Sequence, residues 1–539
     1  MAISYEQGSS STPLLAETIG SNLEKTVSRF GDREALVAIH QSIRLTYNEF
    51  NKLVDDLALG LLNEGFTKGD RIGIWSPNRY EWAIVQYATA KIGVILVNIN
   101  PAYRTFELEY VLDQSGCSAI FAMTSFKTSD YSLMINEVKE RLPGLRRVFL
   151  FEDSSYSDLL VSGAKGDREQ LRSILNQLDF DDPINIQYTS GTTGFPKGAT
   201  LSHHNILNNG YFVGETCKYT EFDSVVIPVP YYHCFGMVMG NLACTSHGSK
   251  MIIPSFAFEP KAALSAVTTE TATSLYGVPT MFIAELADPT FGDYDLSSLR
   301  TGIMAGSPCP VEVMKQVVSK MNMSQVTICY GMTETSPVST QTKVDDEIEK
   351  RVGSVGRVLP HLEVKVVDSD GHCVERGVPG EFLTRGYSVM LGYWNDSKKT
   401  TEAIDPARWM HTGDLAIMDE DGFLNIVGRA KDMIIRGGEN IYPREIEEFL
   451  YSHPDIMDVS VIGIPDPVYG EVVMAWITLK EGANLTQKDI HDYCEGKIAH
   501  YKVPKVIKFV SEFPMTVTGK VQKYVMRQQA IAELGLAPS

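Results

Sequence analysis

A segment rich in glycine and hydroxyl residues, YTSGTTGFPKG at positions 188–198, carries the strongest chemical signal in the sequence. Small residues let backbone N–H groups approach an anion closely, the serine and threonine side chains add hydroxyl donors, and Lys197 adds a positive charge. The segment follows a strand-like run, INIQY, and we expect a helix to open after it near Ser202. It lacks the GK[ST] ending of a Walker A loop, because Gly198 follows Lys197. These residue types therefore predict a binding site for a triphosphate.

Other segments hold residue types that suit a nucleotide, a metal ion or a reacting carboxylate. They are YYHCFG (231–236), AGSPCP (305–310), YGMTET (330–335), WMHTGDL (409–415), GRAKD (428–432), RGGENIYPREIE (436–447), HYKVPK (500–505) and PMTVTGKVQK (514–523). The flat ring of Tyr330 suits a base, the carboxylate of Glu334 suits Mg²⁺, and that of Asp414 can accept two vicinal hydroxyls. The ammonium of Lys520 can bridge a carboxylate and a phosphate. Each residue alone would be an ordinary turn, core or surface residue, so the signal lies in the ordered set.

This ordered set resembles the motifs of the adenylate-forming (AMP-binding) superfamily of acyl-CoA synthetases, peptide-synthetase adenylation domains and firefly-type luciferases. The resemblance extends over nearly the whole chain. It is strongest to medium-chain fatty acyl-CoA synthetases, in TSGTTGFPKGATLSHHNILNN, YGVPTMF, AGSPCP and VMLGYW. The resemblance implies an AMP-forming fatty acid–CoA ligase. Such an enzyme joins a carboxylate to ATP as acyl-AMP with release of pyrophosphate, and then transfers the acyl group to CoA.

The resemblance also implies roles for single residues. Catalysis would involve Lys520, Thr333, Glu334 and His233. ATP and AMP would be bound by Thr189, Ser190, Gly191, Thr192, Thr193, Gly194, Phe195, Pro196, Lys197, Gly306, Ser307, Pro308, Tyr330, Gly331, Met332, Thr333, Asp414, Arg429 and Lys520. Glu334 would hold Mg²⁺, and Lys431 would be the hinge of a rotating C-terminal domain. CoA would be bound by Gly437, Gly438, Glu439, Tyr501 and Lys505. The acyl pocket would be lined by His233, Phe235, Met237, Tyr276, Gly277, Met281, Met304 and Cys329.

Alternating apolar and amphipathic runs predict the elements that must position these residues. We expect strands at 71–75, 94–98, 118–122, 184–188, 224–229, 251–253, 273–276 and 326–330, and helices at 79–92, 106–114 and 444–453. Strand–helix–strand spacing of this kind predicts parallel sheets with crossover helices. From about Leu362, short strands alternate with turns such as DSDG (368–371) and DEDG (419–422).

These patterns predict an α/β fold in two domains, since a chain of 539 residues is too long for one core. The large N-terminal AMP-binding domain, at 1–430, would contain parallel-rich sheets with crossover helices and a β-rich subdomain at about 360–430. The small C-terminal domain, at 431–539, would be α+β, and the resemblance implies that it is mobile.

The bulk composition narrows the partners and the compartment. The formal net charge of −19 argues against binding to nucleic acid or to an anionic membrane, so the phosphate sites must be local. The 8 cysteines show no metal-like spacing, which indicates reduced thiols. We see neither a signal peptide nor a transmembrane segment and expect a cytoplasmic enzyme, and we leave a homodimer open.

The acid and the exact reaction remain open. The residues expected near the acyl chain are apolar and rich in methionine, which suits a flexible aliphatic chain. In amino-acid-activating relatives an aspartate pairs with the substrate ammonium at the place where Cys234 stands here. An aryl acid such as a coumarate or a benzoate is the main alternative, and a carrier-protein thiol could replace CoA. A luciferase-like oxidation and a regulator without chemistry are further alternatives, but the presence of Lys520 and Glu334 favours an enzyme.

Overall fold

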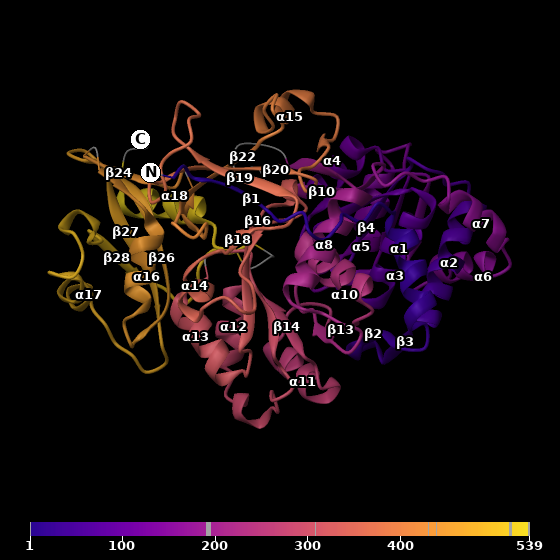
Figure 1. The fold of residues 1–539 in the computed structure, drawn as a ribbon, viewed down its shortest axis with the longest axis horizontal. Coiled ribbons are helices and arrows are strands. Elements are labelled where there is room, and N and C mark those ends of the chain that lie inside the picture. The colour runs from indigo at the N-terminus through magenta and orange to yellow at the C-terminus, as the bar shows by residue number, and fades with distance from the viewer. Residues whose placement is uncertain are drawn as a thin grey trace.

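The computed structural model describes residues 2–189, 196–307, 309–429, 431–437, 439–516 and 520–536. Figure 1 shows the N-terminal half of the chain on one side of the molecule and the C-terminal sheet on the other. The expected α/β class is confirmed, because parallel-rich sheets alternate with helices through most of the chain. Ser190, Gly191, Thr192, Thr193, Gly194, Phe195, Pro308 and Gly438 among the predicted site residues lie outside the described residues.

A seven-stranded sheet carries the Gly-rich segment. In order across the sheet, its strands are β21 (Gly392–Tyr393), β11 (Lys197–Ser202), β10 (Pro183–Thr189), β5 (Ile95–Ile99), β4 (Arg71–Trp75), β6 (Ala119–Ala122) and β9 (Arg147–Leu150). The strands from β10 to β9 are parallel, with α3 (Tyr80–Ile92) and α4 (Thr105–Ser115) as crossover helices. Both helices and the strands β4, β5, β6 and β10 agree with the sequence expectation within one residue at each end.

The segment after the Gly-rich run corrects the expectation of a strand that leads directly into a helix. Strand β11 pairs antiparallel with β10, and Thr189 faces Lys197, so the two strands form a hairpin. Helix α8 (His203–Thr216) begins only after β11, where the Ser202 hydroxyl accepts a hydrogen bond from the backbone N–H of Asn205 at 3.1 Å. The helix start near Ser202 is thus confirmed, whereas the sequence analysis treated the short run KGATLS as part of the loop.

The second large sheet has nine strands. Its order is β18 (Arg357–Val358), β17 (Val338–Gln341), β16 (Gln325–Gly331), β15 (Thr301–Met304), β14 (Ser274–Gly277), β12 (Ser224–Val226), β13 (Lys250–Ile253), β2 (Glu34–Ala38) and β3 (Ile43–Thr46). The helices that accompany it include α11 (Pro260–Glu270), α12 (Pro279–Leu286) and α13 (Val311–Lys320). Strand β12 ends earlier than the expected 224–229, because Ile227 is followed by the turn that leads to the YYHCFG motif.

The β-rich part is an antiparallel sheet of β1 (Tyr5–Gln7), β19 (Leu362–Val367), β20 (Gly380–Gly386), β22 (Met410–Met418) and β23 (Leu424–Arg429). The N-terminal strand β1 pairs with β19, a long-range contact that the sequence analysis did not predict.

The C-terminal sheet has its own core. Its strands are β25 (Glu439–Ile441), β24 (Ile434–Arg436), β27 (Gly470–Leu479), β26 (Ile456–Asp466) and β28 (Val506–Phe509), with helices α16 (Pro443–Tyr451), α17 (Gln487–Cys494) and α18 (Lys523–Leu534). On α16, Arg444 donates to the carbonyls of Ile426 at 3.3 Å and Cys309 at 3.5 Å, and Glu448 accepts from the N–H of Val311 at 3.4 Å. Helix α16 is therefore one of the elements that join the C-terminal sheet to the rest of the molecule through polar contacts.

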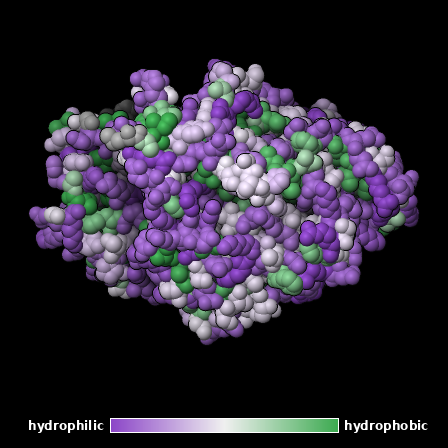
Figure 2. Space-filling view, viewed as in Figure 1, coloured by the Kyte–Doolittle hydropathy of each residue, from purple (hydrophilic) through white to green (hydrophobic). Residues whose placement is uncertain are grey.

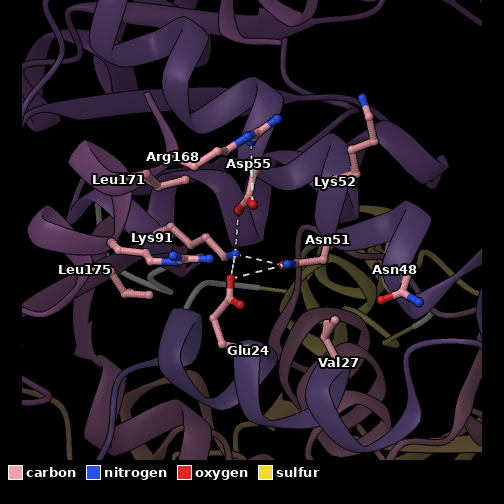
Figure 3. Close-up of a pocket in the computed structure, with 11 residues that line it drawn as sticks. Glu24, Val27, Asn48, Asn51, Lys52, Asp55, Lys91, Arg168, Leu171 and Leu175 are labelled. Carbon is pink, nitrogen blue, oxygen red and sulfur yellow. Dashed lines mark hydrogen bonds and ion pairs between the residues drawn. The ribbon is translucent and has the colours of Figure 1, made fainter. Parts of the chain in front are cut away.

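A buried lysine ties three helices of the N-terminal region together. The helices of this region include α1 (Ile19–Phe30), α2 (Tyr47–Asn63), α5 (Tyr131–Lys139), α6 (Ser154–Gly163) and α7 (Arg168–Leu175). Lys91 on α3 donates to Glu24 of α1 and to Asn51 and Asp55 of α2, the last two at 2.7 and 2.6 Å (Figure 3). All three ammonium donors are thereby used, so the buried charge is satisfied.

No helix in the described ranges is both long and apolar enough to cross a membrane. On the face shown in Figure 2, hydrophilic residues predominate and apolar ones are scattered in small groups.

Candidate active site

The hairpin that carries the Gly-rich segment meets the YGMTET turn. Glu334 lies on a short 3₁₀ turn (Thr333–Thr335) after β16 and is 5% exposed. The hydroxyl of Thr189 lies 3.4 Å from its Oε1. Two motifs that are far apart in sequence therefore share one edge of the site.

Tyr393 on β21 links Glu334 to Lys197. Its hydroxyl donates to Glu334 Oε1 at 2.8 Å and accepts from Lys197 Nζ at 3.0 Å. The sequence analysis quoted VMLGYW only as part of the resemblance and gave Tyr393 no role. The position of Tyr393 in the sequence has no recognisable spacing to the distant Lys197 or Glu334. Only the pairing of β21 with β11 could therefore reveal these contacts.

Glu334 fits the hard-cation role that the sequence predicts. Its carboxylate forms no ion pair with another residue in the described part of the chain, although it is buried. A buried carboxylate beside the hairpin that the sequence predicts to bind phosphate is the type of oxygen donor that Mg²⁺ prefers. The residues present are therefore compatible with a magnesium ion.

Asp414 is the centre of a second group. Its Oδ2 accepts from the Tyr330 hydroxyl at 2.6 Å, and its Oδ1 lies 3.1 Å from Arg429 Nε. Asp414 and Arg429 face each other across β22 and β23, so the antiparallel register itself brings them together. Burial and the Asp414 charge raise the pKa of Tyr330 well above its usual value. The sequence analysis assigned Tyr330 to the base by its ring, and the structure adds a contact of its hydroxyl with the carboxylate expected to meet the ribose.

The remaining described residues of the predicted nucleotide site lie at strand ends. Gly306, with φ of 91°, and Ser307 follow β15, whereas Gly331 ends β16 and Met332 follows it. Strands β15 and β16 are parallel neighbours, so both turns lie at the carboxyl edge of the nine-stranded sheet. Ligands of open α/β sheets bind at this edge.

His233 precedes a short helix, α9 (Cys234–Gly236), and is held in one tautomer. Its Nδ1 accepts the N–H of Phe235 at 3.2 Å, so a neutral ring carries its proton on Nε2. Burial, with a smaller contribution from the nearby Lys520 charge, lowers the pKa of His233 to about 3. The imidazole is therefore neutral at physiological pH.

Lys520 comes from the far end of the chain to the same place. Burial and the charge of Arg429 lower the pKa of its ammonium, while Asp414 and Glu334 act in the opposite direction. Its backbone N–H donates to Thr516 Oγ1 at 3.0 Å. Lys431, the predicted hinge, also lies near Arg429. Burial lowers the pKa of its ammonium, and the charge of Arg429 lowers it further. The structure thus gathers His233, Glu334, Asp414, Arg429 and Lys520 from five separate motifs.

An apolar group adjoins His233. The rings of Phe235 and Tyr276 lie 5.6 Å apart, and both side chains pack in one buried core with Met237, Met281 and Cys329. Gly277 ends β14 directly after Tyr276.

Met304 packs apart from the other residues of the predicted acyl pocket. Its neighbour Ile303 pairs with Tyr276 and shares the core of Tyr276, but Met304 points to the opposite face of the sheet and packs with Phe282 and Cys309. Side chains alternate along a strand, and the sequence alone did not fix which parity faces the site.

The described residues of the predicted CoA site lie in the C-terminal part of the chain, on β25 and in the turns around its sheet. The N–H of Gly437 donates to Tyr469 O at 2.8 Å, and Lys505 Nζ donates to Asp466 Oδ2 at 2.6 Å. Lys505 lowers the pKa of Asp466 to about 2, and Glu439 is exposed while Tyr501 is half-buried. No hydrogen bond or ion pair between described residues joins this set to Lys520 or Glu334.

Comparison with known proteins gives matches along the chain. A family model described as AMP-binding enzyme matches residues 23–394, and one described as AMP-binding enzyme C-terminal domain matches residues 445–520. YngI of Bacillus subtilis (strain 168), provisionally named an acyl-CoA synthetase, is 47% identical over 98% of this chain and 99% of its own length. The mitochondrial medium-chain acyl-CoA ligase ACSF2 of Danio rerio is 46% identical over 99% of this chain and 92% of its own.

Solved structures share the fold as well. The anthranilate CoA ligase AuaEII, in complex with anthranoyl-AMP, has a TM-score of 0.87 at 26% identity, covering 98% of this chain and 99% of the other. Lys520 is the last residue of the second matched range, and His233 and Glu334 lie within the first. Asp414, Arg429 and Lys431 fall between the two.

Proposed function

The chain belongs to the AMP-binding enzyme family and is an AMP-forming acyl-CoA synthetase, and we propose that it activates a medium-chain fatty acid. ATP and CoA are its co-substrates. The assignment of roles rests on one observation. Lys520 lies near Glu334, Asp414, Arg429 and His233, although about a hundred or more residues separate it from most of them in the sequence.

In the first half-reaction, the acid's carboxylate attacks the α-phosphorus of ATP, and the bond to pyrophosphate breaks. Lys520 would bridge the carboxylate and the α-phosphate, and Thr333 would contact that phosphate. Lys197 would stabilise the negative charge that grows on the leaving oxygens. No general base is needed, because the carboxylic acid is already ionised near neutral pH. The neutral His233 would border the acid without adding charge.

The nucleotide would lie along the edge formed by the strand-end turns. Tyr330 would cover the base, and Asp414 with Arg429 would bind the ribose hydroxyls. Glu334 would hold Mg²⁺, which when bound neutralises charge on the phosphate oxygens.

In the second half-reaction, the CoA thiolate attacks the acyl carbon and AMP leaves. We infer that the C-terminal domain, at 431–539, rotates at Lys431 between the two steps. This motion would withdraw Lys520 and present Gly437 and Glu439, which now lie away from the site. The contacts of α16 with the N-terminal part are polar, as is common between domains that move relative to one another, and this supports such a motion.

Two observations favour an aliphatic acid. Relatives named medium-chain acyl-CoA ligase are 43–46% identical to this chain over 99% of its length. The side chains next to His233 are apolar, and Cys234 supplies no charge for a substrate ammonium. An aryl acid is the second candidate, because the anthranilate ligase shares the fold at a TM-score of 0.87.

The acid is tested by measuring ATP- and CoA-dependent AMP release with fatty acids of increasing length from acetate to palmitate, and with benzoate and coumarate. We expect kcat/KM to peak at medium chain lengths. A peak at benzoate or coumarate would transfer the assignment to the aryl acids. A cytoplasmic location and a homodimer stay predictions, and sedimentation equilibrium tests the second.

A further inference from the structure

A chain of amide side chains is buried under the His233 segment. Asn98 lies on β5, and Asn185 and Gln187 lie on β10, with exposures of 2%, 1% and 3%. Strands of a parallel sheet covered on both faces are normally apolar, and a buried amide is costly unless all its groups are bonded. Their presence at the centre of this sheet therefore calls for a reason beyond packing.

The amides form a network in which each N–H₂ group and each oxygen is used. Asn185 donates to Leu96 O and to Asn98 Oδ1, both at 2.9 Å. Gln187 donates to Asn185 Oδ1 at 2.9 Å and to Met237 Sδ at 3.0 Å. A buried network that is complete in this way is rigid and specifies one arrangement of its parts.

Among the described contacts, the network forms bonds outside the sheet only with the segment around His233. Asn98 donates to the carbonyl oxygen of Tyr232 at 2.8 Å and lies 3.6 Å from Met237 Sδ. The thiol of Cys234 donates to Gln187 Oε1 at 3.1 Å. His233 is thus held on both sides, through the residue before it and the residue after it.

The other end of the network lies next to the segment that we expect to bind the nucleotide. Gln187 is two residues before Thr189, with which the Gly-rich segment begins, and β10 continues into that segment without a break. A shift of the His233 segment relative to β10 would break the bonds of Tyr232, Cys234 and Met237 together.

We propose that Asn98, Asn185 and Gln187 are positioning residues that hold the His233 segment in register with the strand carrying the ATP-binding hairpin, and so place the acid against the nucleotide. This inference rests on the proposed function, because it takes His233 to border the acid. ATP contacts the hairpin itself, whereas the acid's place depends on the segment that the network holds. Loss of the network therefore weakens the acid's binding far more than that of ATP.

The main test compares Asn98→Leu with Asn208→Leu. Asn208 on α8 is also fully buried and bonds Leu15 N at 2.7 Å and Leu15 O at 3.1 Å, and its other hydrogen-bond partner is His204, which is not one of the predicted site residues. The two variants lose comparable buried amides. We expect Asn98→Leu to raise the KM for the acid about tenfold in pyrophosphate release and the KM for ATP less than about twofold, as loss of a buried hydrogen bond predicts. Asn208→Leu lowers the unfolding temperature similarly but leaves both KM values near wild type.

A second comparison uses the thiol contact. Cys234→Ala removes the donor to Gln187, and Cys234→Ser keeps one, so the serine variant should recover most of the acid's KM while alanine does not. Gln187→Met preserves the length of the side chain. Its effect on the KM for the acid should be non-additive with the effect of Cys234→Ala if the two side chains act through one bond.

Several results would overturn the proposal. They are equal rises in the two KM values, the same pattern in Asn208→Leu, or a Cys234→Ala variant with wild-type KM for the acid. All variants are assayed with the acid that the wild-type enzyme uses best. If that acid is an aryl acid, the medium-chain assignment fails, and the comparison of acid with ATP still decides the role of the network.

Discussion

The site residues form a cluster of cations in a chain that is acidic overall. Arg429 lowers the pKa values of both Lys431 and Lys520, and Lys197 contributes to that of Lys431. Asp414 and Glu334 offset part of this charge. A triphosphate would relieve the repulsion between the cations, so the local field favours the substrate despite the formal net charge of −19.

Lys520→Ala tests the central assignment at this scale. Loss of the ammonium should lower ATP–pyrophosphate exchange by about a hundredfold or more, because charge developing at the α-phosphate loses its partner. Thioester formation from supplied acyl-AMP should stay within about threefold of wild type. The exposed Lys488 on α17 provides the control as Lys488→Ala. Equal loss in both half-reactions would remove Lys520 from its proposed role.

A second prediction concerns His203, a buried histidine outside the reaction. Its Nδ1 accepts the N–H of Ile19 at 3.1 Å, and burial lowers its pKa to about 3. Between this value and the unfolded pKa of about 6.5, only the unfolded chain binds the proton. Stability is therefore complete above about pH 6.5 and falls by about 1.4 kcal/mol per pH unit below it. His203→Gln should show a shallower fall of the unfolding temperature from pH 6.5 to 5, and an unchanged slope would contradict this.

At the scale of elements, strand ends and turns bring the site together. The parallel neighbours β15 and β16 carry two nucleotide motifs to one edge, and the register of β22 with β23 pairs Asp414 with Arg429. The sequence predicted most of these strands because their apolar runs are local signals. It missed β11 and Tyr393, and it grouped Met304 with residues that pack in a different cluster, because hairpin pairing and strand parity are set by distant partners.

Lys431→Pro tests the proposed hinge. Proline fixes φ and restricts the residue before it, so it should hinder rotation of the C-terminal domain. We expect the thioester half-reaction to slow at least about tenfold more than adenylate formation. Lys431→Ala is the control for loss of the side chain alone. Rapid single-turnover assays of each half-reaction give the two rates, and equal losses in Lys431→Pro would argue against a hinge here.

At the scale of the whole molecule, the N-terminal and C-terminal parts of the chain share one site. The N-terminal region is tied by long-range bonds such as those of Lys91, and α16 contacts it through polar groups. We expect stability to depend on the first part and motion to belong to the second.

Lys91→Met tests the first half of that statement. The substitution leaves Glu24 and Asp55 without their buried cation, whose side chain is only 1% exposed. We expect a loss of about 3 kcal/mol in unfolding free energy with kcat nearly unchanged. Lys25→Met, which removes an exposed partner of Glu17, should cost less than about 1 kcal/mol. Urea titrations followed by tryptophan fluorescence compare the two, and similar losses would show that the network contributes little.

The sequence by itself determined the chemistry and the class of fold. Local composition identified the Gly-rich segment 189–198, the carboxylates Glu334 and Asp414, and the alternation of strands and helices, because each is a property of neighbouring residues. The tertiary structure alone decided which of these residues meet. It brought Lys520 to His233 and Glu334, revealed Tyr393 and the amide network, and left the predicted CoA residues apart. Contacts between residues hundreds of positions apart depend on sheet register and domain placement, which no short segment encodes.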